Sequence, residues 1–156
     1  MIVYHGSPAI VSTPDVYHSR SRVDFGKGFY VTPLREQAIS WCARFARRGS
    51  AYLNTYDLDD NAFDQFSVLR FDSYSEAWLD FVLSCRQGTD DSPYDMVMGG
   101  VANDKVFDTL ELLLSGLISK QEALGRLRFE KPNAQLCIRN QEVINQRLAF
   151  VGSEKQ

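Results

Sequence analysis

The stretch Gly26-Lys27-Gly28-Phe29-Tyr30-Val31-Thr32 joins a tight turn to a short strand, and Pro33 directly after it opens a helix. Glycine supplies the backbone angles that such a turn requires, and the aromatic and β-branched residues after it favour a strand. From Leu34 to Ala46 the apolar residues recur at helical spacing, with Thr32 as a candidate N-cap. A strand that passes directly into an amphipathic helix indicates a domain that mixes both kinds of element.

The same two patterns recur on both sides of this stretch. Further strands are predicted over residues 1–5, 50–57, 68–71, 94–98, 134–138 and 147–151, and further helices over residues 75–85, 105–114 and 119–127. Ser73 or Ser75 is a candidate cap for the first of these helices and Ser119 for the last. The sequence therefore predicts a mixed α+β fold, with one domain over residues 1–151 and a flexible tail over 152–156.

The bulk composition narrows the class of protein. A net charge of −3 over 156 residues gives no general attraction to nucleic acid or anionic lipid. No apolar run approaches the ~20 residues that cross a bilayer, so no membrane partner is expected. Cys42, Cys85 and Cys137 form no metal-binding spacing and sit among apolar neighbours, as small buried thiols do. Reduced thiols favour a cytoplasmic location.

Two further short motifs carry chemistry. His5 lies in Tyr4-His5-Gly6-Ser7 at the end of the first strand, and Gln135 opens Gln135-Leu136-Cys137-Ile138-Arg139-Asn140 in a late strand. An imidazole can hydrogen-bond a ribose hydroxyl. Gly6, which has no side chain, lets a ligand approach its N–H and C=O closely enough to pair with a carboxamide. A lone histidine near the N-terminus is usually a surface or core residue, so the functional interpretation depends on the motifs occurring together.

In their order and local sequence, these motifs resemble the His-Tyr-Glu signature of the diphtheria-toxin and poly(ADP-ribose) polymerase branch of the ADP-ribosyltransferases, with Gln135 in the third position. The resemblance is strong over residues 2–8, 24–46 and 134–150. The chain also looks like a bacterial family of ADP-ribosyltransferase-like domains thought to act as toxins paired with a small antitoxin, in which Gln is a usual third residue. The resemblance implies a split β-sheet core flanked by helices, with NAD+ as co-substrate and no metal.

The resemblance also implies roles for individual residues. His5, Gly6 and Ser7 would hold the ribose and the carboxamide, Tyr30 would stack on the nicotinamide, and Trp41, eleven residues later, would cover the other face of the ring. The alternative for Trp41 is a place in the core. Gln135 would orient the ribose without supplying the negative charge of a glutamate.

Other polar residues are candidates to assist. Asp104, at the end of a predicted strand, is the first candidate to share the work of Gln135, the alternative being that it caps the following helix. Asp24 is the second, the alternative being a turn residue. Arg20, Arg22 and Lys27 are expected to meet the pyrophosphate of the dinucleotide, the alternative being that they are simply solvated. Gly28 is a further candidate for the cofactor site, the alternative being that it only forms a tight turn.

The expected function is that of an NAD+-dependent mono-ADP-ribosyltransferase, a bacterial toxin or effector that modifies a protein or nucleic acid. Alternatives are an NAD+ glycohydrolase, in which water replaces the acceptor, and a catalytically weakened module that binds NAD+ or ADP-ribose. A small antitoxin is the expected protein partner, with Tyr17, Tyr52 and Tyr56 as exposed aromatic residues for its interface.

Overall fold

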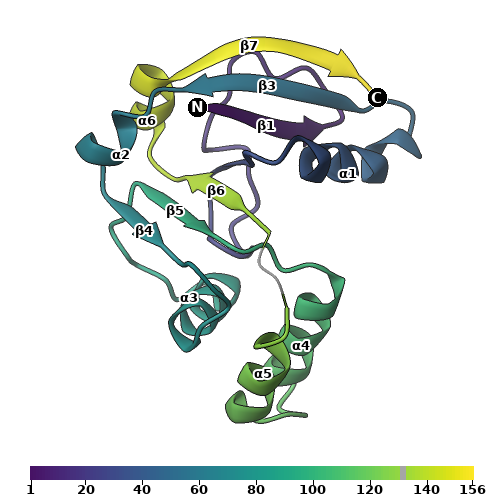
Figure 1. Ribbon diagram of the computed structural model, residues 1–156, viewed down its shortest axis with the longest axis vertical. Helices are drawn as coiled ribbons and strands as arrows, with labels where there is room; N and C mark the ends of the chain where they lie inside the picture. The colour runs from purple at the N-terminus through teal and green to yellow at the C-terminus, as the bar shows by residue number, and fades with distance from the viewer. Residues whose placement is uncertain (131–132) are drawn as a thin grey trace.

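The computed structural model describes residues 1–130 and 133–156. Its first element is strand β1 (Ile2–Ser7). It pairs antiparallel with β3 (Tyr52–Leu58), and β3 pairs antiparallel with β7 (Leu148–Lys155). This three-stranded sheet, called sheet A, lies at the top of Figure 1.

A second sheet, called sheet B, has the strand order β2-β6-β5-β4. Its strands are β2 (Phe29–Val31), β6 (Gln135–Ile138), β5 (Met96–Gly99) and β4 (Val68–Arg70). The β4–β5 pair is parallel and the other pairs are antiparallel. An isolated bridge between Tyr4 and Thr32 connects β1 of sheet A to the residue after β2 of sheet B.

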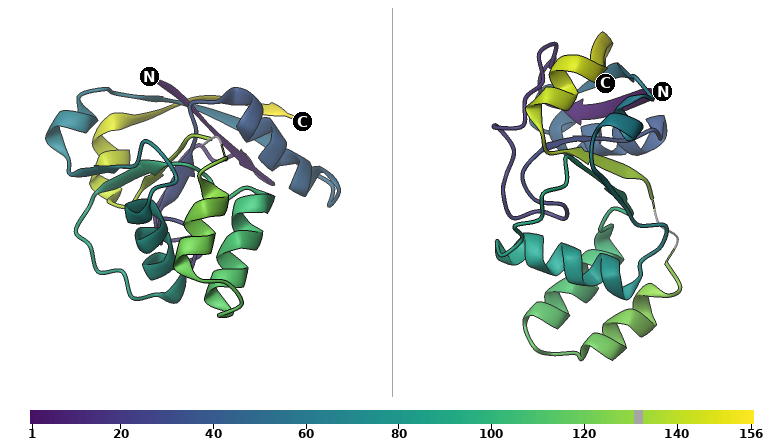
Figure 2. Two further views of the ribbon diagram at one scale, coloured as in Figure 1. Left: turned by 60° about the horizontal axis from the view of Figure 1, so that its bottom comes forward. Right: turned by 90° about the vertical axis from the view of Figure 1, so that its left-hand side faces the viewer.

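The helices surround the two sheets, and most of them lie on the outer faces. They are α1 (Arg35–Ala46), α2 (Ala62–Gln65), α3 (Glu76–Gln87), α4 (Asp104–Leu114), α5 (Lys120–Leu127) and α6 (Gln141–Arg147). Helix α1 packs on sheet A, whereas α3, α4 and α5 gather on the side of sheet B that faces away from sheet A (Figures 1 and 2). The described residues thus form a mixed α+β fold with two sheets and six helices, which confirms the predicted class.

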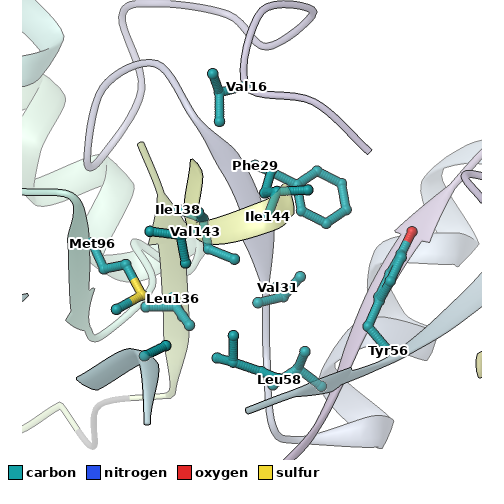
Figure 3. Packing of buried hydrophobic residues seen from close by; sticks show 12 residues of the cluster. Val16, Phe29, Val31, Tyr56, Leu58, Met96, Leu136, Ile138, Val143 and Ile144 are labelled. Atoms are coloured by element: carbon teal, nitrogen blue, oxygen red, sulfur yellow. The ribbon is translucent and has the colours of Figure 1, made fainter. Parts of the chain in front are cut away.

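Among the described residues, the buried apolar side chains form three clusters. The first fills the space between the two sheets, where Val31 and Phe29 of β2 meet Tyr56 and Leu58 of β3 (Figure 3). The second lies between the other face of sheet B and helices α3, α4 and α5. The third lies between sheet A and α1. Because alternate residues of β2 and β6 point to opposite faces, sheet B contributes to both of the first two clusters.

Two of the predicted helix caps are confirmed and one is wrong. Ser75 Oγ accepts the N–H of Trp78 at the start of α3, and Ser119 Oγ accepts the N–H of Glu122 at the start of α5. Thr32 does not cap α1, because its Oγ1 accepts the N–H of Leu34, one residue before the helix begins.

The predicted flexible tail is also wrong. Strand β7 extends to Lys155, which lies opposite Tyr52, and the Gln156 N–H donates to the Ala51 carbonyl at 2.9 Å. The open edge of β3 offers backbone donors and acceptors, and pairing with them orders the end of the chain. No helix was predicted over residues 141–147, which form α6; Asn140 Oδ1 caps its start by accepting the Glu142 N–H at 2.9 Å.

No helix within residues 1–130 and 133–156 combines the length and the apolar character that crossing a lipid bilayer requires. The three cysteines are free thiols and are all buried, as predicted.

Candidate functional site

Strands β1 and β2 share an isolated rung and then diverge. The Tyr4 N–H donates to the Thr32 carbonyl at 2.8 Å, and the Thr32 N–H donates to the Tyr4 carbonyl at 2.9 Å. In a continuous antiparallel ladder the next such rung would join Gly6 to Tyr30, two residues further along each strand. Instead, the Tyr30 carbonyl lies 2.7 Å from His5 Nδ1. The imidazole therefore replaces the backbone of β1 as the partner of β2.

This contact determines the tautomer of His5. A carbonyl oxygen can only accept, so Nδ1 carries the proton and Nε2 of the neutral ring remains an acceptor. Burial lowers the pKa of His5, and the hydrogen bond to Tyr30 opposes this effect only in part. The ring also packs on Phe29, with their centroids 4.7 Å apart. At neutral pH the site therefore presents an uncharged imidazole with an acceptor nitrogen.

Gly6 lies directly against α1. A Cβ at this position would stand 2.5 Å from the Ala38 carbonyl oxygen and 3.0 Å from Cys42 Sγ, so the packing excludes a side chain. Because Tyr4 directs its N–H and C=O towards β2, the alternation along a strand directs those of Gly6 the same way. These two backbone groups therefore face the edge along which β1 and β2 diverge.

The Tyr30 side chain is held firmly by the preceding turn. Its hydroxyl donates to the Gly26 carbonyl at 2.6 Å and accepts the Phe25 N–H at 3.1 Å. Burial, with a smaller contribution from Cys137, raises the pKa of Tyr30 well above its ordinary value. Gly26 has a φ of 74°, which confirms that the turn needs permissive backbone angles. The phenol thus stays protonated, and the orientation of its partly buried ring is fixed.

Gln135 opens β6 and is only 5% exposed. Its Nε2 donates to Asp24 Oδ2 at 3.2 Å and to the Gly100 carbonyl at 3.3 Å. Tyr30 lies opposite Cys137 in the β2–β6 pair, and Gln135 is two residues before Cys137. Because side chains alternate along a strand, Gln135 and Tyr30 lie on the same face of sheet B.

Asp24 is the residue that the fold places beside Gln135. It is 8% exposed, and its Oδ1 accepts hydrogen bonds from Arg86 Nε at 3.1 Å and from an Arg86 terminal nitrogen at 2.5 Å. Its Oδ2 accepts the Ala102 N–H at 3.0 Å in addition to Gln135. Asp24 does lie in a turn, which the Gly26 N–H closes by donating to the Val23 carbonyl at 3.1 Å, and its carboxylate in addition connects three distant segments.

The structure does not place Asp104 in contact with Gln135, whose role it was expected to share. It is the exposed first residue of α4, and within the described part of the chain it makes no hydrogen bond to Gln135. The alternative, that Asp104 caps the helix, is wrong: Asn103 has the extended backbone of an N-cap, and its Oδ1 accepts the Val106 N–H at 3.0 Å.

Trp41 and Ser7 both have partners elsewhere in the fold. Trp41 is half-buried on α1 in the cluster under sheet A, whereas Tyr30 packs against the cluster under sheet B. Among the aromatic pairs of the described residues, none joins these two rings. Ser7 Oγ donates to the Ala9 carbonyl and accepts Asn54 Nδ2 at 3.1 Å, so it fixes the loop after β1.

The predicted pyrophosphate-binding residues surround the turn before β2. The side chains of Arg20, Arg22 and Lys27 are exposed, and Lys27 Nζ lies 5.9 Å above the ring of Tyr17. At Gly28, a Cβ would stand 2.5 Å from Cys137 Sγ, so this glycine permits close packing of β2 on β6.

Two residues that the sequence interpretation missed organise the site. Asn54 is fully buried on β3, where its Oδ1 accepts the Val11 N–H at 2.9 Å. Arg86 continues the buried stripe of α3 after Leu79 and Val82, which is the spacing of a helix face turned inward. The position of the charged Arg86 on this apolar face of α3 was the sequence signal that it has a buried partner.

Two cavities lie near the motifs. One of about 170 Å³ is lined by the ends of β4, β5 and β6, including Arg70, Asp72, Asn133 and Gln135. The other, of about 540 Å³, lies beside Tyr17, Tyr94 and Arg139. Neither is lined by His5 or Tyr30.

The aromatic residues expected at a partner interface differ in exposure. Tyr17 is 64% exposed and Tyr52 is half-buried. Tyr56 is fully buried, and its hydroxyl donates to the Val11 carbonyl at 2.6 Å, so the expectation is wrong for this residue.

The family model described as "Protein of unknown function (DUF3990)" matches residues 1–150. No curated protein and no solved structure matches the chain.

Proposed function

The chain belongs to the family described as protein of unknown function (DUF3990), and we propose that it binds NAD+ and transfers ADP-ribose to a macromolecular acceptor. The observation that carries the proposal is the hydrogen bond between His5 Nδ1 and the Tyr30 carbonyl. It links the first two motif residues directly, and it diverts the Tyr30 carbonyl from a rung with Gly6. The backbone of Gly6 is thereby left to pair with a ligand.

The groups along this edge suit the nicotinamide riboside half of NAD+. The N–H and C=O of Gly6 match the acceptor and donor of the carboxamide. His5 Nε2 can accept a hydrogen bond from a ribose hydroxyl. The ring of Tyr30 offers a flat surface for the pyridinium, a type of contact worth about 1–3 kcal/mol.

The proposed reaction breaks the bond between the anomeric carbon of the ribose and the nicotinamide nitrogen, and the electron pair of that bond neutralises the pyridinium. A nucleophile of the acceptor forms the new bond to the anomeric carbon and loses its proton to solvent. Gln135 would accept a hydrogen bond from the ribose 2′-hydroxyl and so orient the sugar for attack. No metal takes part in this scheme.

An amide at position 135 lowers the expected rate. A hydrogen bond to a charged group contributes about 1.5–3 kcal/mol, against about 0.5–1.5 kcal/mol for a neutral one. The difference corresponds to about one or two powers of ten in rate. Slow transfer is therefore expected when compared with an enzyme that has a glutamate at this position.

The neutral amide also supports a second candidate, a module that binds NAD+ or ADP-ribose without turnover. Hydrolysis of NAD+ is a variant of the first proposal in which water is the acceptor. We further propose that the protein is toxic in a cell and that a small antitoxin neutralises it. The exposed Tyr17 is a candidate contact for such a partner.

Incubation of the purified protein with NAD+ labelled in its adenylate half, in the presence of cell lysate, tests the proposal. Label on protein or nucleic acid supports transfer, and free ADP-ribose alone supports hydrolysis. His5→Asn should abolish the signal, whereas His18→Asn is the matched control, because His18 is the second of the two histidines and its side chain is 91% exposed. If the unmodified protein releases no nicotinamide at all, the enzymatic proposal is wrong.

A further inference from the structure

The side-chain amide of Gln135 has a fixed orientation. Both groups near its Nε2, the Asp24 carboxylate and the Gly100 carbonyl, can only accept hydrogen bonds. The nitrogen must therefore point towards them, and both of its protons are used. What remains for a ligand is the oxygen, Oε1.

The carboxylate that imposes this orientation is itself immobilised. Asp24 accepts two hydrogen bonds from Arg86, one from Ala102 and one from Gln135, all between 2.5 and 3.2 Å. The side chains of Asp24 and Arg86 are only 11% and 16% exposed. The pair comes from the loop before β2 and from α3, whereas Gln135 comes from β6, so the contact depends on the complete fold.

We propose that Asp24 is a positioning residue for the reaction, which rests on the proposed function. It holds the Gln135 amide so that Oε1 is presented to the ribose, in place of the carboxylate oxygen of a glutamate. The same geometry explains the residue type at position 135. An ionised glutamate there would face Asp24 Oδ2 and the Gly100 carbonyl with no proton between them, whereas a glutamine supplies both protons.

A charge-exchange experiment tests the coupling without any substrate. In Gln135→Glu the two carboxylates would retain a shared proton at pH values where separate carboxylates have lost theirs. The folded state would then bind more protons than the unfolded state, so its stability should fall as pH rises above about 4. In Asp24→Asn/Gln135→Glu an amide again faces a carboxylate, and this added pH dependence should disappear.

Turnover tests the positioning role. Asp24→Asn preserves the size of the side chain but replaces one of the two acceptors that orient the Gln135 amide with a group that can also donate, so kcat for nicotinamide release should fall about 10- to 100-fold with KM nearly unchanged. The matched control is Asp90→Asn. Asp90 forms a similar ion pair with Arg139, at 2.6 Å and with side chains 10% and 16% exposed, and it makes no contact with Gln135 in the described residues.

The outcomes separate the two proposals. Loss of kcat in Asp24→Asn with normal turnover in Asp90→Asn supports positioning, and equal loss in both variants overturns it in favour of a structural role. If Gln135→Glu shows the stability profile of the unmodified protein from about pH 4 to 8, the coupling itself is wrong. If the unmodified protein releases no nicotinamide, the proposed function fails and the positioning role fails with it, while the stability profiles still report whether Asp24 and Gln135 are coupled.

Discussion

His5 Nδ1 donates a 2.7 Å hydrogen bond to the Tyr30 carbonyl, and this bond stands where the next rung between β1 and β2 would be. The side chain thereby has two separate functions on its two nitrogens. Nδ1 joins the two sheets, and Nε2 remains for a ligand. Variants that preserve one nitrogen at a time can separate stability from function.

His5→Asn places an amide nitrogen near the position of Nδ1, and His5→Gln reaches the position of Nε2. The asparagine variant should retain most of the stability, because it still donates to the Tyr30 carbonyl. The glutamine variant should lose about 1–3 kcal/mol, because a buried carbonyl loses its donor. Urea unfolding of both variants measures the difference, and equal stability of the two would show that the Nδ1 contact contributes nothing.

The lowered pKa of His5 predicts how stability changes with pH. Below the ordinary histidine pKa of about 6.5, His5 becomes protonated in the unfolded chain while the buried ring of the folded protein is still neutral. The free energy of unfolding should therefore decrease as pH falls from about 7 towards the folded pKa, by at most about 1.4 kcal/mol per pH unit. Unfolding curves from about pH 5 to 8 measure this dependence. His5→Asn should remove it and His18→Asn should not; a dependence that His18→Asn removes instead would assign it to the other histidine.

Two glycine substitutions should have opposite effects. Gly6→Ala forces a methyl group within 2.5 Å of the Ala38 carbonyl and should destabilise the protein by about 1–3 kcal/mol. Gly125→Ala in α5 meets no atom within 4 Å and should stabilise it by about 0.5–1 kcal/mol. Thermal melting compares the two directly. If Gly6→Ala melts at the same temperature as the unmodified chain, α1 does not pack on β1 as described.

The cysteines should be unreactive in the folded protein. All three are buried, and burial raises the pKa of Cys85 and of Cys137 to about 12. A thiol attacks a disulfide reagent through its thiolate, so a cysteine that is both buried and protonated should not react. Titration with such a reagent should detect no fast thiol before unfolding and three after addition of urea. A fast thiol in the native protein would contradict the packing around that cysteine.

Local elements could be predicted from the sequence because local chemistry determines them. Ser75 and Ser119 precede helices in the way that caps do, and Gly26 precedes β2 with the expected positive φ. Helix α6 shows the limit, because it is short, was not predicted over residues 141–147, and starts at a cap in which Asn140 Oδ1 accepts the Glu142 N–H.

The environment of Gln135 could not be predicted from the sequence. Its partner Asp24 is 111 positions away, and the Arg86 that holds Asp24 belongs to a third segment. Such contacts follow from how the sheet and the helix pack and leave no local pattern. Asp104 was the stronger candidate on local grounds alone, since it follows a strand, yet Asn103 occupies the capping position and leaves Asp104 exposed.

Calorimetric titration of NAD+ and of nicotinamide into the purified protein tests the central proposal most directly, with His5→Asn and His18→Asn as the matched pair. The edge formed by His5, Gly6 and Tyr30 predicts that both ligands bind to the unmodified protein and to His18→Asn, and that NAD+ binds much more weakly to His5→Asn. Absence of binding at millimolar NAD+, or equal affinity in all three proteins, would contradict an NAD+ site at the divergence of β1 and β2.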